Sequence, residues 1–181
     1  MKIYAVADIH SQASRLAMIE TNIARFEPDV LVAAGDIISW VKPAPVYERL
    51  NALPVPVLAV RGNTDPFWQE ALYSKYPNIR SLHMRKINLG GHAFFGIGGT
   101  IPVPFRNRLK LLERTMLDDV KRLIDRQTIL VVHPPPWGVL DKVMGRFRAG
   151  SKGVAEILFD RRPPVLICGH IHEASGVECM Y

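Results

Sequence analysis

The sequence predicts an α/β fold, because short apolar runs alternate along the chain with segments of helical periodicity. Each run has the length of a buried strand and is rich in Val, Ile, Leu and Ala. The later runs are separated by fewer clean helical crossovers, which favours a mixed sheet. The six predicted strands are residues 3–7, 30–34, 57–60, 93–97, 129–132 and 165–168.

Helical patterns fill the segments between these strands. Apolar side chains recur at helical spacing in residues 12–26, where Ser11 fits the N-cap position. Asp65 suits the N-cap of a later helix, with Pro66 at its first helical position. The five predicted helices are residues 12–26, 45–52, 66–75, 108–125 and, after Ser151, 152–160.

Length and composition predict one globular domain covering residues 1–181, with no internal repeat or linker. Hydrophobic residues make up 48% of the chain and charged residues 22%, yet no apolar run approaches the roughly 18 residues that span a bilayer. We therefore expect no membrane segment. Two cysteines, Cys168 and Cys179, give no disulfide framework, so we expect a reducing cytoplasmic environment.

The chain is basic, with a formal net charge of +6 and a pI near 9.5. Its positive charge is densest in residues 106–126 and 142–162. Such charge favours phosphate-bearing ligands. Acidic residues are interspersed, however, and no basic–aromatic alternation occurs, which argues against a dedicated nucleic-acid-binding protein.

Five of the six predicted strands are followed by short polar segments, called pieces below, whose side chains can bind a metal ion. Strand ends converge at one edge of a sheet, where α/β proteins build their sites, so we expect these pieces to lie together. Carboxylate, amide and imidazole groups in such a cluster predict a metal site, with enough ligands for two ions. The pieces are Asp8-Ile9-His10, Gly35-Asp36, Gly62-Asn63, His133 and Gly169-His170-Ile171-His172.

Each piece alone also has an ordinary structural interpretation. Asp8 and His10 can grip one ion if the segment is extended, because side chains two apart then share a side, but Asp-x-His also occurs by chance. The two oxygens of Asp36 can bridge two cations or cap a turn. Asn63 can be a turn residue, and His133 a hydrogen-bonded structural residue. The order and number of the pieces favour a genuine dinuclear site.

These motifs resemble those of the calcineurin-like metallophosphoesterases: DIH at 8–10, GDII at 35–38, GNTD at 62–65, VVHPP at 131–135 and GHIH at 169–172. The segment RAGSKGVAEIL before PPVLICGHIHE is similar to the small, single-domain prokaryotic phosphoesterase branch. The resemblance implies a four-layer α/β/β/α sandwich with two mixed β-sheets.

The resemblance also implies a ligand set and an activity. One ion would be held by Asp8, His10, Asp36 and His172, and the other by Asp36, Asn63, His133 and His170, with Asp36 bridging. The family uses Mn, Fe, Zn, Ni or Co, and we expect Mn to support activity. The implied reaction is hydrolysis of a phosphate ester by a hydroxide that bridges the two ions. The implied catalytic residues are Asp36, Asn63, Thr64 and His133.

Two departures from the family pattern shape this expectation. Where the family usually has a His after the Asn, this chain has Thr64, which is a poor proton donor. A positioned acid typically contributes about 10²–10⁴-fold, and good leaving groups need it least, so a phosphodiesterase is favoured over a phosphomonoesterase. The chain also ends nine residues after His172, where the family usually continues with strands of the second sheet. An incomplete second sheet would expose an edge and favour a homo-oligomer.

Secondary candidates and competing functions remain open at this level. Four arginines could reach a phosphate or simply lie in solvent, and residues 96–99 form a Gly-rich strand end with no Lys-Ser/Thr. His83 and His92 suit structural or surface positions. The alternatives to a phosphoesterase are a weakly active or inactive scaffold for protein–protein interaction and a nuclease. The arginines are Arg106, Arg108, Arg146 and Arg148.

Overall fold

A computed structural model describes residues 1–38, 43–99 and 117–181. Its first sheet contains β1 (Ile3–Val6), β2 (Val30–Ala34), β3 (Val57–Val60) and β4 (Ile79–Ser81), in that order. All three strand pairs are parallel. The prediction of a mixed first sheet is therefore wrong for these strands, because the chain returns to the same end of the sheet after every strand.

The second sheet has the order β10-β7-β6-β5 and is mixed, as expected. β5 (Lys86–Leu89) and β6 (His92–Ile97) form an antiparallel hairpin across Gly90-Gly91. β6 pairs in parallel with β7 (Thr128–Val132), and β7 with β10 (Val165–Ile167). β4 and β5 were not predicted from the sequence, since neither is a continuous apolar run.

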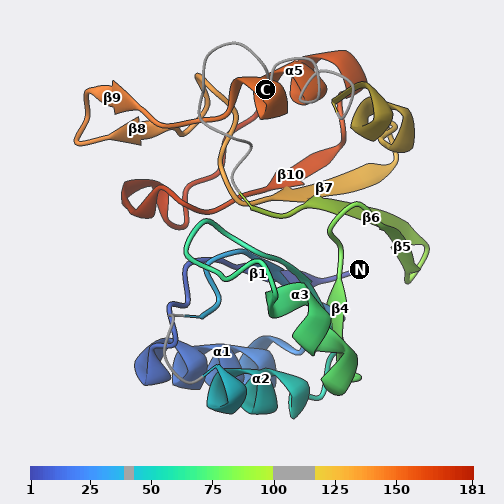
Figure 1. Ribbon diagram of the computed structural model, residues 1–181, viewed down its shortest axis with the longest axis vertical. Helices are drawn as coiled ribbons and strands as arrows, with labels where there is room; N and C mark the ends of the chain where they lie inside the picture. The colour runs from blue at the N-terminus through green and yellow to red at the C-terminus, as the bar shows by residue number, and fades with distance from the viewer. Residues whose placement is uncertain (39–42, 100–116) are drawn as a thin grey trace.

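A third, two-stranded ribbon is formed by β8 (Lys142–Val143) and β9 (Phe147–Arg148). Figure 1 shows it projecting beyond the second sheet.

The helices confirm the general pattern but move two predicted boundaries. The N-cap residue of α1 (Ala13–Phe26) is Gln12, which makes no side-chain capping hydrogen bond, so the predicted Ser11 cap is wrong. α3 (Gln69–Leu72) begins later than expected, because the Asp65 carboxylate binds backbone amides outside this helix. Ser151 caps α5 by accepting a hydrogen bond from Val154 N–H. The other bounds are α2 (Ala44–Asn51), η1 (Tyr73–Lys75), α5 (Lys152–Arg161) and η2 (His172–Ala174).

The predicted helix at 108–125 lies partly outside the described residues. Within the part that the structure describes, residues 117–123 are helical.

The two sheets pack face to face, with helices on their outer sides (Figure 1). Alternate residues of β2 explain this arrangement, because successive strand residues point to opposite faces. Leu31 and Ala33 pack with the buried faces of α1 and α2, whereas Val30, Val32 and Ala34 pack towards the second sheet. A third apolar cluster joins the far face of β6 and β7 to α5. The α/β class with two sheets is thus confirmed.

Among the described residues, no helix has the length and apolar character that a membrane span requires.

Candidate metal centre

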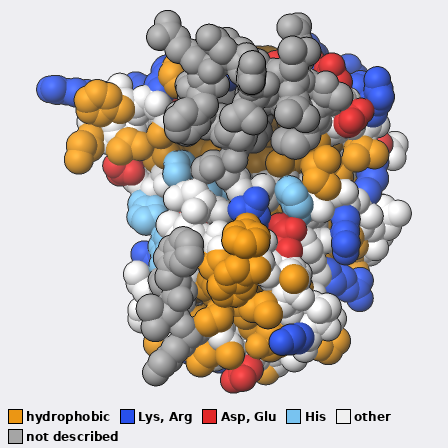
Figure 2. Space-filling view, in the orientation of Figure 1, with side chains coloured by type: hydrophobic (Ala, Val, Ile, Leu, Met, Phe, Trp, Pro, Cys, Tyr) orange, Lys and Arg blue, Asp and Glu red, His pale blue; other side chains and the backbone are white. Residues whose placement is uncertain are grey.

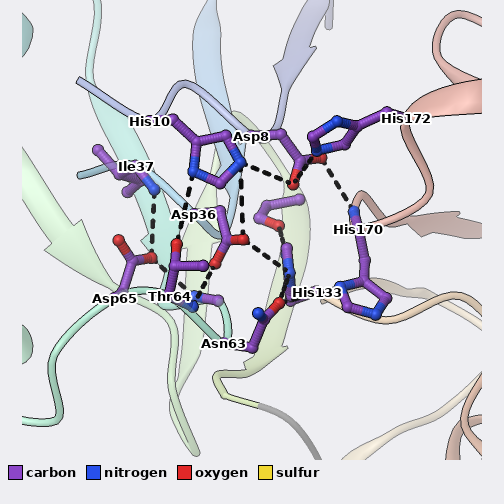
Figure 3. A network of polar contacts seen from close by, with 12 residues as sticks. Asp8, His10, Asp36, Ile37, Asn63, Thr64, Asp65, His133, His170 and His172 are labelled. Atoms are coloured by element: carbon purple, nitrogen blue, oxygen red, sulfur yellow. Dashed lines mark hydrogen bonds and ion pairs between the residues drawn. The ribbon is translucent and has the colours of Figure 1, made fainter. Parts of the chain in front are cut away.

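All of the predicted site pieces come together beyond the ends of β1, β2, β3, β7 and β10 (Figure 3). Because these five strands run parallel within their sheets, the loops that follow them meet at one end of the molecule. Among the residues that the structure describes, two groups of side chains have ligand atoms within 4.8 Å of one another: Asp8, His10 and His172, and Asp8, Asp36 and His133.

Asp36 lies at the centre of this cluster and is nearly fully buried. The backbone N–H of Thr64 donates to its Oδ1 over 2.9 Å. Its Oδ2 lies 3.8 Å from His10 Nε2 and 3.5 Å from His133 Nε2. One carboxylate oxygen is therefore fixed by the backbone, while the other faces imidazoles from both parts of the cluster.

His133 is fully buried, and its orientation is set by the end of β2. Its Nδ1 donates to the carbonyl oxygen of Ala34 over 2.9 Å, because that oxygen can only accept. In the neutral ring Nε2 then carries a lone pair, and it faces Asn63 Oδ1, another acceptor, at 2.8 Å. A metal ion bound by both atoms fits this arrangement.

His170 also approaches this amide oxygen. Its Nδ1 lies 2.9 Å from Asn63 Oδ1, and its ring stands edge-on to that of His133 at 5.0 Å. Burial lowers the pKa of His170, and the neighbouring His133 lowers it further. The neutral form thus favoured is the form that ligates a metal.

Asp8 supplies a second indication of a cation. Its Oδ2 accepts the backbone N–H of His170 over 2.9 Å, but its buried Oδ1 has no hydrogen-bond donor among the described residues. That oxygen lies 3.8 Å from His10 Nε2 and 3.5 Å from His172 Nε2. A buried carboxylate oxygen without a donor is costly unless a charge compensates it. A cation held with both imidazoles fits the donor set.

Left-handed backbone turns bring these side chains together. Asp8, His10, Asp36 and His170 have φ values of 55°, 51°, 51° and 72°. The expectation that Asp8 and His10 lie on an extended segment is therefore wrong, although both still face the cluster. Such conformations are unfavourable for residues with a Cβ and concentrate at functional sites, where the surroundings impose them.

Glycine is required where two of the loops touch. A Cβ on Gly62 would lie 2.0 Å from Asp36 Oδ1, and a Cβ on Gly169 would lie 2.3 Å from the Cβ of Ala7. The Gly of each motif therefore allows the close approach that places the ligand beside it.

Asp65 has a role that the sequence analysis missed. It is buried, and its carboxylate accepts backbone N–H groups from Ile37, Ile38 and Gly62. These bonds join the loop after β2 to the loop after β3, and so fix Asp36 relative to Asn63. Burial raises the pKa of Asp65, which the three backbone bonds offset in part. The sequence feature that could have indicated this role is the position of Asp65 as the last residue of the GNTD motif.

Thr64 lies beside the cluster, with its hydroxyl 3.5 Å from His10 Nδ1.

In the described part of the chain, the secondary candidates named from the sequence are not among the ligand atoms of the cluster. Arg148 pairs with the buried Asp141 at 2.7 Å, and His83 Nδ1 accepts the backbone N–H of Gly98, which is a structural role. Arg146 lies in the β8–β9 turn, whereas Arg106 and Arg108 lie outside the described residues.

The Asp8 side of the centre borders a cavity of about 430 Å³. Asp8 and His172 lie in its wall together with apolar side chains such as Met18 and Ile171. The Arg15 guanidinium, also in this wall, donates to the carbonyl oxygen of Asp8 and holds the residue in its left-handed turn.

The sequence model of the calcineurin-like phosphoesterases matches residues 1–174, which contain every ligand candidate described above. The chain belongs to this family. The resemblance inferred from the motifs is thus confirmed, and membership implies a hydrolase acting on phosphate esters. No curated protein matches the chain.

Solved structures share the fold at low sequence identity. One crystal structure superposes with a TM-score of 0.74 at 22% identity, covering 94% of this chain and 84% of the other. TT1561 of Thermus thermophilus gives 0.68 at 18% identity, with 92% and 80% covered. A structure described as a novel archaeal phosphodiesterase gives 0.50 at 16% identity, with 80% and 79% covered. These likenesses support the α/β fold with two sheets.

Proposed function

We propose that this chain is a metal-dependent phosphodiesterase with two divalent ions in its active site. The observation that carries the proposal is one acceptor atom in each half of the cluster that a cation would satisfy: Asp8 Oδ1, which has no donor among the described residues, and Asn63 Oδ1, which faces His133 Nε2. Bound cations would give both oxygens a positively charged partner. Because the site is assembled from loops along nearly the whole chain, we treat residues 1–181 as one domain.

The proposed ligands divide between two ions, with Asp36 shared. Asp8, His10 and His172 would complete the first set, and Asn63, His133 and His170 the second. When bound, two such ions acidify water and offset charge on the phosphoryl oxygens. The imidazole and carboxylate donors suit Mn, Fe, Zn, Ni or Co, and we propose Mn²⁺ as the activating ion.

The protein's own groups fix the geometry of the reaction. The Ala34 carbonyl holds the His133 ring in one tautomer, and the Thr64 backbone holds one oxygen of Asp36. Asn63 is exposed, so its amide lies where substrate can enter. The Thr64 hydroxyl can donate a hydrogen bond to a phosphoryl oxygen but cannot act as a strong acid at neutral pH.

The family usually has a His, a possible general acid, where this chain has Thr64, and this difference favours diesters with good leaving groups. A leaving oxygen of low pKa departs without a proton, whereas an alkyl monoester loses the benefit of a positioned acid. The archaeal phosphodiesterase of similar fold supports the same choice.

The test compares bis-p-nitrophenyl phosphate with p-nitrophenyl phosphate on metal-stripped protein, with and without Mn²⁺. We expect Mn²⁺-dependent hydrolysis that prefers the diester. Asp36→Ala and His133→Ala should each lower kcat/KM by at least about 100-fold, since loss of even an outer-shell partner costs 10–100-fold. Asp118→Ala removes an exposed carboxylate outside the site and is the matched control.

Two results would contradict the proposal. Activity that persists in both Asp36→Ala and His133→Ala would place catalysis elsewhere. Metal binding without hydrolysis of either substrate would favour the alternative of an inactive scaffold for protein–protein interaction.

A further inference from the structure

We propose that Phe67 and Trp68 form an aromatic subsite that stacks on the base of a nucleotide phosphate ester. The inference rests on the proposed function, because it assigns the substrate class of the same metal centre. It gives a role to two large side chains that the metal chemistry leaves unused.

Both side chains are exposed although their neighbours are buried. Phe67 is 83% exposed and Trp68 is 39% exposed. Asp65 and Pro66 on one side and Gln69 on the other are buried. The chain therefore buries polar groups at Asp65 and Gln69 while leaving two aromatic rings in solvent, which is the reverse of the usual preference.

The two rings stand on a turn that is anchored at both ends. Gln69 N–H donates to the Pro66 carbonyl over 3.0 Å, so Phe67 and Trp68 are the central residues of a closed turn. Before the turn, Asp65 accepts three backbone bonds; after it, Gln69 Nε2 donates to the Tyr73 hydroxyl over 2.8 Å. A turn fixed in this way loses little freedom when a ligand binds.

The turn follows the loop that carries Asn63 and Thr64. Phe67 comes three positions after Thr64, which limits their Cα separation to about 11 Å. A base attached through a sugar to a phosphate at the metal centre spans a comparable distance. The turn is tied to the centre through Asp65, since that carboxylate also binds Gly62, the residue before Asn63.

The surface around the turn suits a planar ligand joined to an anion. Figure 2 shows hydrophobic side chains gathered over the position that α3 occupies in Figure 1, with Lys or Arg, Asp or Glu and His side chains along one border. Arg61 is a partly exposed cation close in sequence to Asn63, and its Nε lies 3.7 Å from Glu70 Oε1. A flat aromatic surface accommodates a base and does not require base-specific hydrogen bonds.

The test measures binding of two phosphates that differ in the base. Thymidine 5′-monophosphate and 2-deoxyribose 5-phosphate are titrated calorimetrically into Mn²⁺-loaded protein. We expect the thymidine compound to bind about 5- to 100-fold more tightly, the range that stacking of one base supplies. Phe67→Ala with Trp68→Ala should remove that difference and leave the affinity for 2-deoxyribose 5-phosphate unchanged. Phe159→Ala removes a ring of similar exposure, 69%, from α5 and is the control.

Two further variants separate stacking from simple apolar contact. Phe67→Leu and Trp68→Leu keep apolar volume but lose the flat ring, so they should also lose the preference for the base. Equal binding of the two phosphates by the wild type would overturn the proposal, as would unchanged selectivity in the Ala or Leu variants. If the variants change only the oligomeric state in sedimentation, the patch is a protein interface and the proposal is likewise overturned.

Failure of this inference is distinguishable from failure of the proposed function. Hydrolysis of bis-p-nitrophenyl phosphate without base selectivity removes only the aromatic subsite. Base-selective binding without hydrolysis of the diester would refute only the proposed phosphodiesterase activity. If neither phosphate binds although bis-p-nitrophenyl phosphate is hydrolysed, only the aromatic subsite is refuted.

Discussion

The two halves of the candidate metal centre are built in contrasting ways. In the half around His133, three ligands follow the interior strands β2, β3 and β7, and the His133 side chain is fully buried; only its fourth ligand, His170, comes from the loop after the edge strand β10. The half around His172 follows the edge strands β1 and β10, and the His172 side chain is 57% exposed. The first half is held by the protein core, and the second by turns at its margin.

This contrast separates two physical demands on a metal site. A ligand within the core is positioned by packing, so its replacement disturbs folding as well as binding. A ligand at the margin is positioned by a few hydrogen bonds and a strained turn, so its replacement leaves the core intact. We therefore expect the His133 half to combine stability with function and the His172 half to affect function alone.

The contrast between the two halves is tested most directly by truncating one imidazole in each. His133→Ala should destabilise the fold by about 2–3 kcal/mol, because it leaves the Ala34 carbonyl unpaired and opens a buried cavity. At about 2–4 °C per kcal/mol, Tm should fall by about 4–12 °C. His172→Ala should leave the Tm of metal-free protein unchanged. Both should lose Mn²⁺-dependent activity by at least about 100-fold.

Calorimetry of the two metal-free variants, followed by assays with Mn²⁺, checks this pair. Equal loss of Tm in both variants would show that the exposed half is as much part of the core as the buried half.

The candidate ligands of both halves were predicted from the sequence, but the backbone geometry of the exposed half was not. Asp36, Asn63 and His133 directly follow continuous apolar runs, and such runs predict interior strands and their ends. Asp8 and His10 were also identified, but through an extended geometry that the structure replaces with left-handed turns. A left-handed conformation of Asp or His has no sequence signature comparable with glycine's, because neighbouring hydrogen bonds impose it.

Other features depended on long-range contacts that a local pattern does not reveal. Asp65 reads locally as a helix cap, yet its carboxylate binds amides 27 and 28 residues away in Ile38 and Ile37. β4 was missed because its three residues, Ile79–Ser81, become a strand only by pairing with β3. Local periodicity thus predicted the strands that form the core, whereas pairing and loop contacts supplied the remainder.

Asp65 offers a second and smaller test, since it ties the loops of the buried half together. Asp65→Asn places an amide NH₂ against backbone N–H donors, which should cost about 1–3 kcal/mol of stability. Displacement of Asp36 relative to Asn63 should lower Mn²⁺ affinity or activity by about 10–100-fold, the usual effect of losing an outer-shell partner. Asp118→Asn makes the same chemical change at an exposed position and is the control.

Thermal unfolding and Mn²⁺ titration of Asp65→Asn measure the two effects separately. Unchanged Mn²⁺ affinity would mean that the loops hold their positions without this carboxylate.

Arg15 offers the corresponding test of the exposed half, with the smallest expected effect. Its guanidinium donates to the Asp8 carbonyl oxygen, so Arg15→Ala should loosen the left-handed turn at Asp8 without exposing a core group. A hydrogen bond from a charged donor is worth about 1.5–3 kcal/mol, and solvent at this margin can replace much of it. We expect Mn²⁺ affinity to fall by less than about 10-fold and Tm to stay constant. Arg122→Ala, at an exposed arginine on the 117–123 helix, is the control. If Arg15→Ala lowered Tm as much as Asp65→Asn, turns at the margin would support the fold as strongly as the loops of the core, and the distinction between the two halves would fail.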